Sequence, residues 1–269
     1  MRKNAMVICC YVCVAAAFGA FFRWIQNQAA FEADTGLVIY GSIWSKIVVL
    51  LCLAAATGIL GLVVGLRKKD FYPATTCATV FRGTTPLPPY IYNTLAVVMI
   101  VGGVVLYVVA KYEQYGAILR LLSIFAVLSG LSFRYLVSAP YKKHEDALQC
   151  LCCAVTVLMY SYWLIVCYKL HAATPSAWTY GFEVLAIGAN AISFYYVAGY
   201  AFGRVRPYRS LFFSMLGAFL SLVTLPDGHY LGMQLMFVAS AGMQMYFAWM
   251  ITANMRLEKP MEEPGGKEE

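Results

Sequence analysis

The sequence predicts an all-α membrane protein, a polytopic bundle of about eight transmembrane helices with both termini in the cytoplasm. Hydrophobic residues make up 61% of the 269-residue chain and charged residues only 12%, about half the charged share of a soluble globular domain. The apolar residues also form runs close to the roughly 20 residues that a helix needs to cross a bilayer. These features exclude a disordered chain, a disulfide-rich miniprotein and an ordinary soluble enzyme.

The apolar runs lack the alternation of barrel strands, so each is expected to form a helix. The first run follows Arg2 and Lys3 and resembles a secretory signal peptide, but it exceeds the usual apolar region of about 7–15 residues. We therefore expect it to remain as the first span. The third and seventh runs are short, which leaves a seven-span arrangement open. The expected spans are 5–23, 47–66, 94–110, 117–138, 147–169, 179–202, 211–225 and 233–254.

Lysine and arginine divide unequally between the two sides that eight spans create. Fifteen of the 20 fall on the side that holds both termini, and five fall on the other. Cytoplasmic loops carry such an excess, so both termini are expected in the cytoplasm. The same placement accounts for the net charge of +7 without a nucleic-acid partner. Residues 1–255 are expected to form one transmembrane domain, and the charged segment 256–269 a disordered cytoplasmic tail.

Ionisable side chains inside the spans are few, and each is by default a functional hypothesis because burying a charge in lipid is costly. Glu183 and Arg120 both lie about one turn inside a span, near the expected outer face. We predict that they pair or share a bound solute, with a helix-locking ion pair as the alternative. Asn190 lies seven residues after Glu183 on the same helix face. It is expected to line the same cavity or to hydrogen-bond a neighbouring helix.

The first external connection contains a second pair of acidic residues. Glu32 and Asp34 lie two residues apart, and two carboxylates outside the membrane can hold a cation or a cationic solute. The alternative is a turn in which Asp34 hydrogen-bonds its own backbone and Gly36 takes a positive φ.

A short motif surrounds this pair. Phe22-Arg23-Trp24 followed by Phe31-Glu32-x-Asp34-Thr35-Gly36-Leu37 resembles a recurrent motif of uncharacterised multi-span membrane proteins of Gram-positive anaerobes. The match covers about sixteen residues, and no activity comes with it. The resemblance implies a bacterial cytoplasmic membrane. It also implies that Arg23 acts together with Glu32 or Asp34 at the outer face.

Cofactor and metal chemistry have little support in the sequence. Eight of the nine cysteines lie within apolar runs, where cysteine behaves as a small apolar residue, so no metal site is expected. The chain contains no H-E-x-x-H, G-x-S-x-G or P-loop pattern, which removes the support for a metalloprotease or an ATPase. No cofactor is expected.

The leading functional hypothesis is therefore non-catalytic binding or transport of a small solute by a bilayer-embedded bundle. Its cavity would open outward between the spans 5–23, 117–138 and 179–202. An alternative is a structural or regulatory subunit that docks a membrane or cytoplasmic protein partner, and a weaker one is a membrane-embedded enzyme. The candidate ligand-binding residues are Arg23, Glu32, Asp34, Arg120, Glu183 and Asn190.

Overall fold

The structure is a computed structural model that describes residues 2–32, 37–68, 80–81, 89–138, 146–172, 174 and 176–255. The predicted all-α class is confirmed. Within the described ranges, β pairing is limited to one isolated bridge between Phe31 and Val38. The eight named helices are α1 (Arg2–Ala29), α2 (Ile43–Arg67), α4 (Pro89–Val109), α5 (Gly116–Ser138), α6 (Asp146–Leu170), α7 (Gly181–Ala201), α8 (Pro207–Val223) and α9 (Leu231–Ala253).

Seven of these helices are long and apolar enough to cross a membrane, so the chain is a multi-pass membrane protein. The eighth, α8, has 17 residues and a length of about 25 Å, somewhat less than a hydrocarbon core of about 30 Å. It matches the short seventh run of the sequence. Most of α8 is buried, because it packs against α1, α7 and α9.

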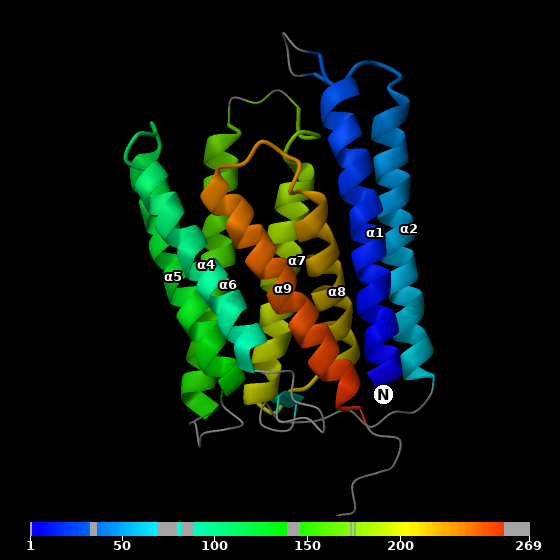
Figure 1. Ribbon diagram of the computed structural model, residues 1–269, viewed down its shortest axis with the longest axis vertical. Coiled ribbons are helices and arrows are strands. Elements are labelled where there is room, and N and C mark those ends of the chain that lie inside the picture. Colours follow the sequence, from blue (N-terminus) through cyan, green and yellow to red (C-terminus); the bar gives the residue numbers. More distant parts are fainter. Residues whose placement is uncertain are drawn as a thin grey trace, which may run out of the picture.

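The helices form an antiparallel bundle around α9 (Figure 1). α9 is the most buried of the seven long helices and packs mainly against α4, α8 and α1. The helices α1 and α2 lie together along one side of the bundle in this view, and α5 lies on the opposite side. α1 begins and α9 ends at the same end of the bundle, which we call the terminal end. The opposite end, which holds the α6–α7 and α8–α9 connections, is called the Glu183 end.

Small residues let the central helix approach its neighbour closely. A Cβ atom on Gly232 of α9 would lie 2.6 Å from the backbone nitrogen of Leu106 in α4. Such close backbone approach is typical of helix pairs in membranes, where small residues increase van der Waals contact.

The α1–α2 connection is shorter than its sequence indicates. The apolar run ends at residue 23, but α1 continues to Ala29 and α2 already begins at Ile43. The extension is polar and yet partly internal, because Gln26 is fully buried and hydrogen-bonded to Ser45 of α2. Tertiary hydrogen bonds thus extend the helix beyond its apolar stretch. The predicted tail 256–269 lies outside the described residues.

Candidate functional site

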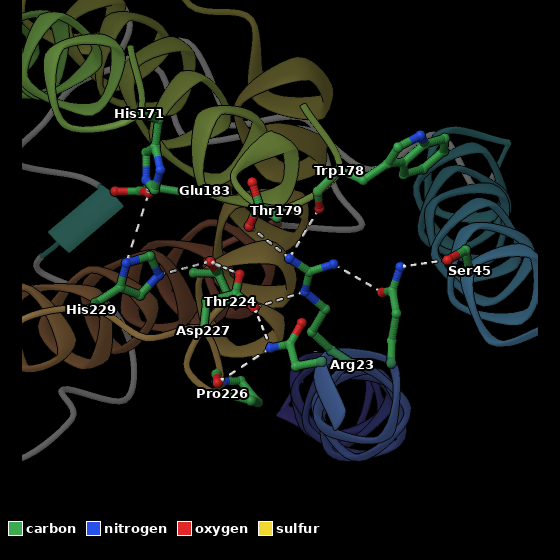
Figure 2. A network of polar contacts seen from close by, with 12 residues as sticks. Arg23, Ser45, His171, Trp178, Thr179, Glu183, Thr224, Pro226, Asp227 and His229 are labelled. Atoms are coloured by element: carbon green, nitrogen blue, oxygen red, sulfur yellow. Dashed lines mark hydrogen bonds and ion pairs between the residues drawn. The ribbon is translucent and has the colours of Figure 1, made fainter. Parts of the chain in front are cut away.

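Glu183 lies in the first turn of α7 with only 1% of its side chain exposed. A carboxylate is favoured there because the unpaired amides of a helix N-terminus carry partial positive charge. Its Oε2 atom lies 3.2 Å from Nε2 of His171 and 3.7 Å from Nδ1 of His229 (Figure 2). Its other oxygen, Oε1, is buried and has no hydrogen-bond partner among the described residues. Glu183 is therefore an acidic centre shared by two imidazoles.

The two histidines come from different connections at the Glu183 end. His171 directly follows α6 and stacks on Tyr180, with ring centroids 4.8 Å apart. Its side chain is 27% exposed, whereas that of His229, in the α8–α9 connection, is 7% exposed. His171 is thus the member of the group that solvent can reach.

A chain of hydrogen bonds determines which nitrogen of His229 faces Glu183. The Thr224 hydroxyl donates to Oδ2 of Asp227 at 3.0 Å, and its oxygen lies 3.2 Å from Nε2 of His229. Because a carboxylate only accepts, the hydroxyl proton is committed to Asp227. The Nε2 atom of His229 must then be the donor to Thr224, and Nδ1 is the atom that faces Glu183.

Arg23 continues this network into α1. Its Nε donates to Oδ1 of Asp227 at 2.7 Å and its Nη1 to Oε1 of Gln26 at 2.8 Å. Its Nη2 donates to the backbone oxygens of Trp178 at 3.2 Å and Thr179 at 2.8 Å. The side chain is fully buried. Arg23 therefore joins α1 to both the α6–α7 and α8–α9 connections (Figure 2).

A thiol completes the group around Glu183. Cys167 is buried in the last turn of α6, four residues before His171. Its sulfur, a ring nitrogen of His171 and a carboxylate oxygen of Glu183 all lie within 4.8 Å of one another. Thiolate, imidazole and carboxylate are the donors that bind zinc in proteins. The cluster can therefore hold a proton or a cation.

A second set of buried polar side chains runs between α7, α8 and α9. The Asn190 amide donates to Oγ of Ser221 at 2.8 Å. The Ser193 hydroxyl lies 2.6 Å from Oε1 of Gln244 and 2.8 Å from Oγ of Ser214. These residues are fully buried. We call this set, together with Ser210, the α7–α8–α9 track.

Three polar atoms of the track have no hydrogen-bond partner among the described residues: Oδ1 of Asn190, Nε2 of Gln244 and Oγ of Ser210. They are spread along the bundle, since Asn190 lies two turns inside α7 and Ser210 lies in the first turn of α8. Apolar side chains would fill the same space without unmet hydrogen bonds. The track therefore occupies several depths of the bundle, from Asn190 in α7 to Ser210 in the first turn of α8.

The predicted pairing of Glu183 with Arg120 is wrong. Arg120 is exposed, and its Nε donates to the backbone oxygen of Gly116 in the preceding turn of its own helix. The electrostatic partners of Glu183 are His171 and His229. The expected equal depth did not mean proximity, because α5, which holds Arg120, packs mainly against α4 and α6, whereas Glu183 lies on α7.

The other candidates have mixed outcomes. Asn190 forms the expected bond to a neighbouring helix, through Ser221. Glu32 is exposed, and its backbone nitrogen bonds the oxygen of Leu37 across the α1–α2 connection. Asp34 lies outside the described residues. Arg23 forms an ion pair with Asp227, and its implied partnership with Glu32 or Asp34 stays a prediction.

Sequence reasoning missed the residues that surround Glu183. Asp227, His171 and His229 were not among the candidate residues, because nothing in the sequence joins connections far apart in the chain. One local signal was present: Cys167 and His171 are four residues apart, so they share a helix face.

Tyr230, at the Glu183 end, has a phenol with a raised pKa. The Tyr230 hydroxyl donates to Oε2 of Glu113 at 2.9 Å. Burial, followed by the hydrogen bond and the negative charge of Glu113, raises the pKa of Tyr230. The contact joins the α4–α5 connection to the start of α9, and it needs the protonated phenol.

Comparisons with known proteins give this chain no family. No protein-family model, curated protein or solved structure matches it. A fold of apolar helices is compatible with many activities, so function has to be argued from the chemistry of the site.

Proposed function

We propose that this chain is a multi-pass protein of a bacterial cytoplasmic membrane that binds a small cationic solute at Glu183 and passes it along the α7–α8–α9 track. In this proposal the Glu183 end faces outward, which the distribution of lysine and arginine supports. One observation carries the proposal: the buried carboxylate of Glu183, on the same helix as Asn190, has one oxygen without a hydrogen-bond partner among the described residues.

The electrostatics of Glu183 favour a cation. Leaving a carboxylate oxygen unmet in a low-dielectric interior costs several times more than the same defect in water. A hydrogen bond from His171 relieves only Oε2, and Nδ1 of His229 lies 3.7 Å from that same atom. A small cation bound by the carboxylate would compensate the charge. The partly exposed His171 marks the side from which it would enter.

The track supports passage as well as binding. A solute leaving Glu183 meets Asn190 about 10 Å further along α7, at the rise of an α-helix. Beyond it lie Gln244 and Ser210, each with a polar atom that lacks a protein partner. Unmet groups at successive depths are what a hydrated or transiently occupied path would satisfy.

The test is uptake into vesicles that contain the purified full-length protein. K⁺, methylammonium and Zn²⁺ serve as separate probes. Glu183→Gln should lower uptake of the accepted probe about tenfold or more, because a charge-assisted contact is worth about 1.5–3 kcal/mol. Glu113→Gln is the matched control, since Glu113 lies at the same end but bonds Tyr230. Equal loss in both variants would contradict a role for Glu183 in uptake.

A second variant separates binding from passage. Gln244→Leu removes the polar group midway along the track and keeps a side chain of similar length. It should leave binding of the accepted probe unchanged and lower its uptake. Unchanged uptake in this variant would contradict passage along the track.

The alternative is a structural or regulatory subunit, and the Arg23 network favours it. Arg23 donates hydrogen bonds to Asp227 and Gln26 and to two backbone oxygens of the α6–α7 connection, as a helix-locking residue would. Under this alternative, Glu183→Gln lowers the stability of the protein without any effect on the uptake of the three probes.

A further inference from the structure

We propose that Cys167, His171 and Glu183, joined by His229, form a binding site for a divalent transition-metal ion of the Zn²⁺ class. The inference names the cation of the site described above, so it rests on the proposed cation binding at Glu183. It does not depend on passage along the track. Among the described residues, this is the only group of three or more such ligands that lies close enough together to share one ion.

The distances suit a tetrahedral ion. Bonds of about 2.0–2.3 Å to zinc place neighbouring ligand atoms roughly 3.3–3.8 Å apart. Oε2 of Glu183 lies 3.2 Å from Nε2 of His171 and 3.7 Å from Nδ1 of His229. The Cys167 sulfur lies within 4.8 Å of its partners. A contraction of about 1 Å or less, well within side-chain rotation, brings Cys167, His171 and Glu183 to these separations, and His229 already lies at 3.7 Å from Glu183.

The orientation of His229 also favours a positive centre at this point. The Nε2 proton of His229 is donated to Thr224, so a neutral His229 would direct the lone pair of Nδ1 toward the carboxylate of Glu183. Two acceptors would then face each other at 3.7 Å, which is repulsive. Either a second proton on His229 or a metal ion between the two groups removes the repulsion.

Charge balance distinguishes these two solutions. A Zn²⁺ ion with one thiolate, one carboxylate and two neutral imidazoles is a neutral unit, which a low-dielectric interior tolerates best. A second proton on His229 also neutralises Glu183, whose carboxylate then keeps the hydrogen bond of the Cys167 thiol. The metal would instead take a ligand from each of the four residues. A soft thiolate beside imidazole selects Zn²⁺ over Mg²⁺ or Ca²⁺.

The surroundings provide the outer contacts that metal-binding histidines usually have. The ring of His229 is oriented by Thr224, which is held by Asp227, and Asp227 by Arg23. Such outer partners typically change metal affinity about 10–100-fold when they are removed. The partly exposed His171 provides a route for entry from the Glu183 end.

The experiment measures metal binding by the full-length protein in detergent. Titration with Zn²⁺ alone should show one ion per chain, with affinity that rises with pH because the thiol must lose its proton. Titration with Co²⁺ should produce the near-ultraviolet charge-transfer absorption of a thiolate ligand. Mg²⁺ should not compete. Absence of stoichiometric Zn²⁺ binding would overturn the inference.

Matched variants identify the ligands. Cys167→Ala should abolish the Co²⁺ charge-transfer band and weaken Zn²⁺ binding by more than about 100-fold, beyond the range of outer-shell changes. Cys153→Ala is the control, because Cys153 is equally buried on the same helix but is not in the group. Thr224→Val should weaken Zn²⁺ binding about 10–100-fold and keep the band. A band that survives Cys167→Ala would overturn the inference.

The two proposals fail in distinguishable ways. If Zn²⁺ binds through Cys167 but no probe enters the vesicles, passage is wrong and the metal site stands. If K⁺ or methylammonium uptake depends on Glu183 while the protein binds no Zn²⁺, the metal site is wrong and the cation path stands. Protein that is folded, as judged by helical circular dichroism, and binds none of the probes contradicts both proposals.

Discussion

The ion pair between Arg23 and Asp227 should be the strongest single stabilising interaction at the Glu183 end. Arg23→Met leaves the Asp227 carboxylate buried without its cation, which typically costs about 3–5 kcal/mol. It also removes three further donor contacts, to Gln26, Trp178 and Thr179. Hydrogen bonds between membrane helices average about 0.6 kcal/mol, so these add about 2 kcal/mol. The expected loss is about 5 kcal/mol, a large share of a typical stability of about 5–15 kcal/mol.

A double-mutant cycle isolates the ion pair from the other contacts. The free energy of unfolding is measured in mixed micelles for Arg23→Met, Asp227→Leu and the double variant. Removing both charges leaves no buried ion unpaired, so the double variant should be more stable than the sum of the single losses by about 3 kcal/mol or more. Arg120→Met is the control, because that exposed side chain bonds only its own helix and should change stability by about 0.5 kcal/mol or less.

Two results would refute this reasoning. A loss below about 1 kcal/mol for Arg23→Met would show that the network contributes little. Additive single losses would show that Arg23 and Asp227 are not energetically coupled, despite the 2.7 Å between Nε and Oδ1.

Two other positions test packing and protonation. Gly217→Ala would place a Cβ atom 2.8 Å from Oδ1 of Asn190 and should lower the free energy of unfolding by about 1–3 kcal/mol. Gly188→Ala is the control, because no atom lies within 4 Å of the added Cβ, and it should cause no such loss. Equal losses in the two variants would contradict the close approach at Gly217. The raised pKa of Tyr230 means that its bond to Glu113 stabilises the fold below about pH 10 and is lost as pH rises through the raised value. The free energy of unfolding should therefore fall more steeply with rising alkaline pH in the wild type than in Tyr230→Phe. Parallel pH profiles for the two proteins would contradict a stabilising bond between Tyr230 and Glu113.

The spans and the candidate site were predictable to different extents. Apolar runs of sufficient length predicted every long helix, because in lipid a helix satisfies its own backbone whatever its neighbours are. The end of α1 was not predictable in this way. Buried contacts of Arg23 and Gln26 extend the helix past the apolar run, and those contacts come from other parts of the chain.

The partners of Glu183 also depend on packing that the sequence does not reveal. Glu183 and Arg120 have the opposite charges and similar depths that made them natural partners, but depth along a helix says nothing about the face on which a residue lies in the packed bundle. The residues that do surround Glu183, namely Cys167, His171 and His229, lie 16, 12 and 46 positions from it along the chain. Only the packing of α6 and α7 and the α8–α9 connection brings them to one point.

Hydropathy alone was therefore enough to predict a helical bundle in a bilayer and to single out Glu183 as a costly buried charge. The identity of its neighbours, two imidazoles and a thiol, was decided by how the helices pack, because side chains on separate helices meet only through tertiary contacts. Membrane insertion depends on the free energy of transfer of each segment taken by itself. A set of ligand residues depends instead on the distances between segments, and one sequence is compatible with many such sets.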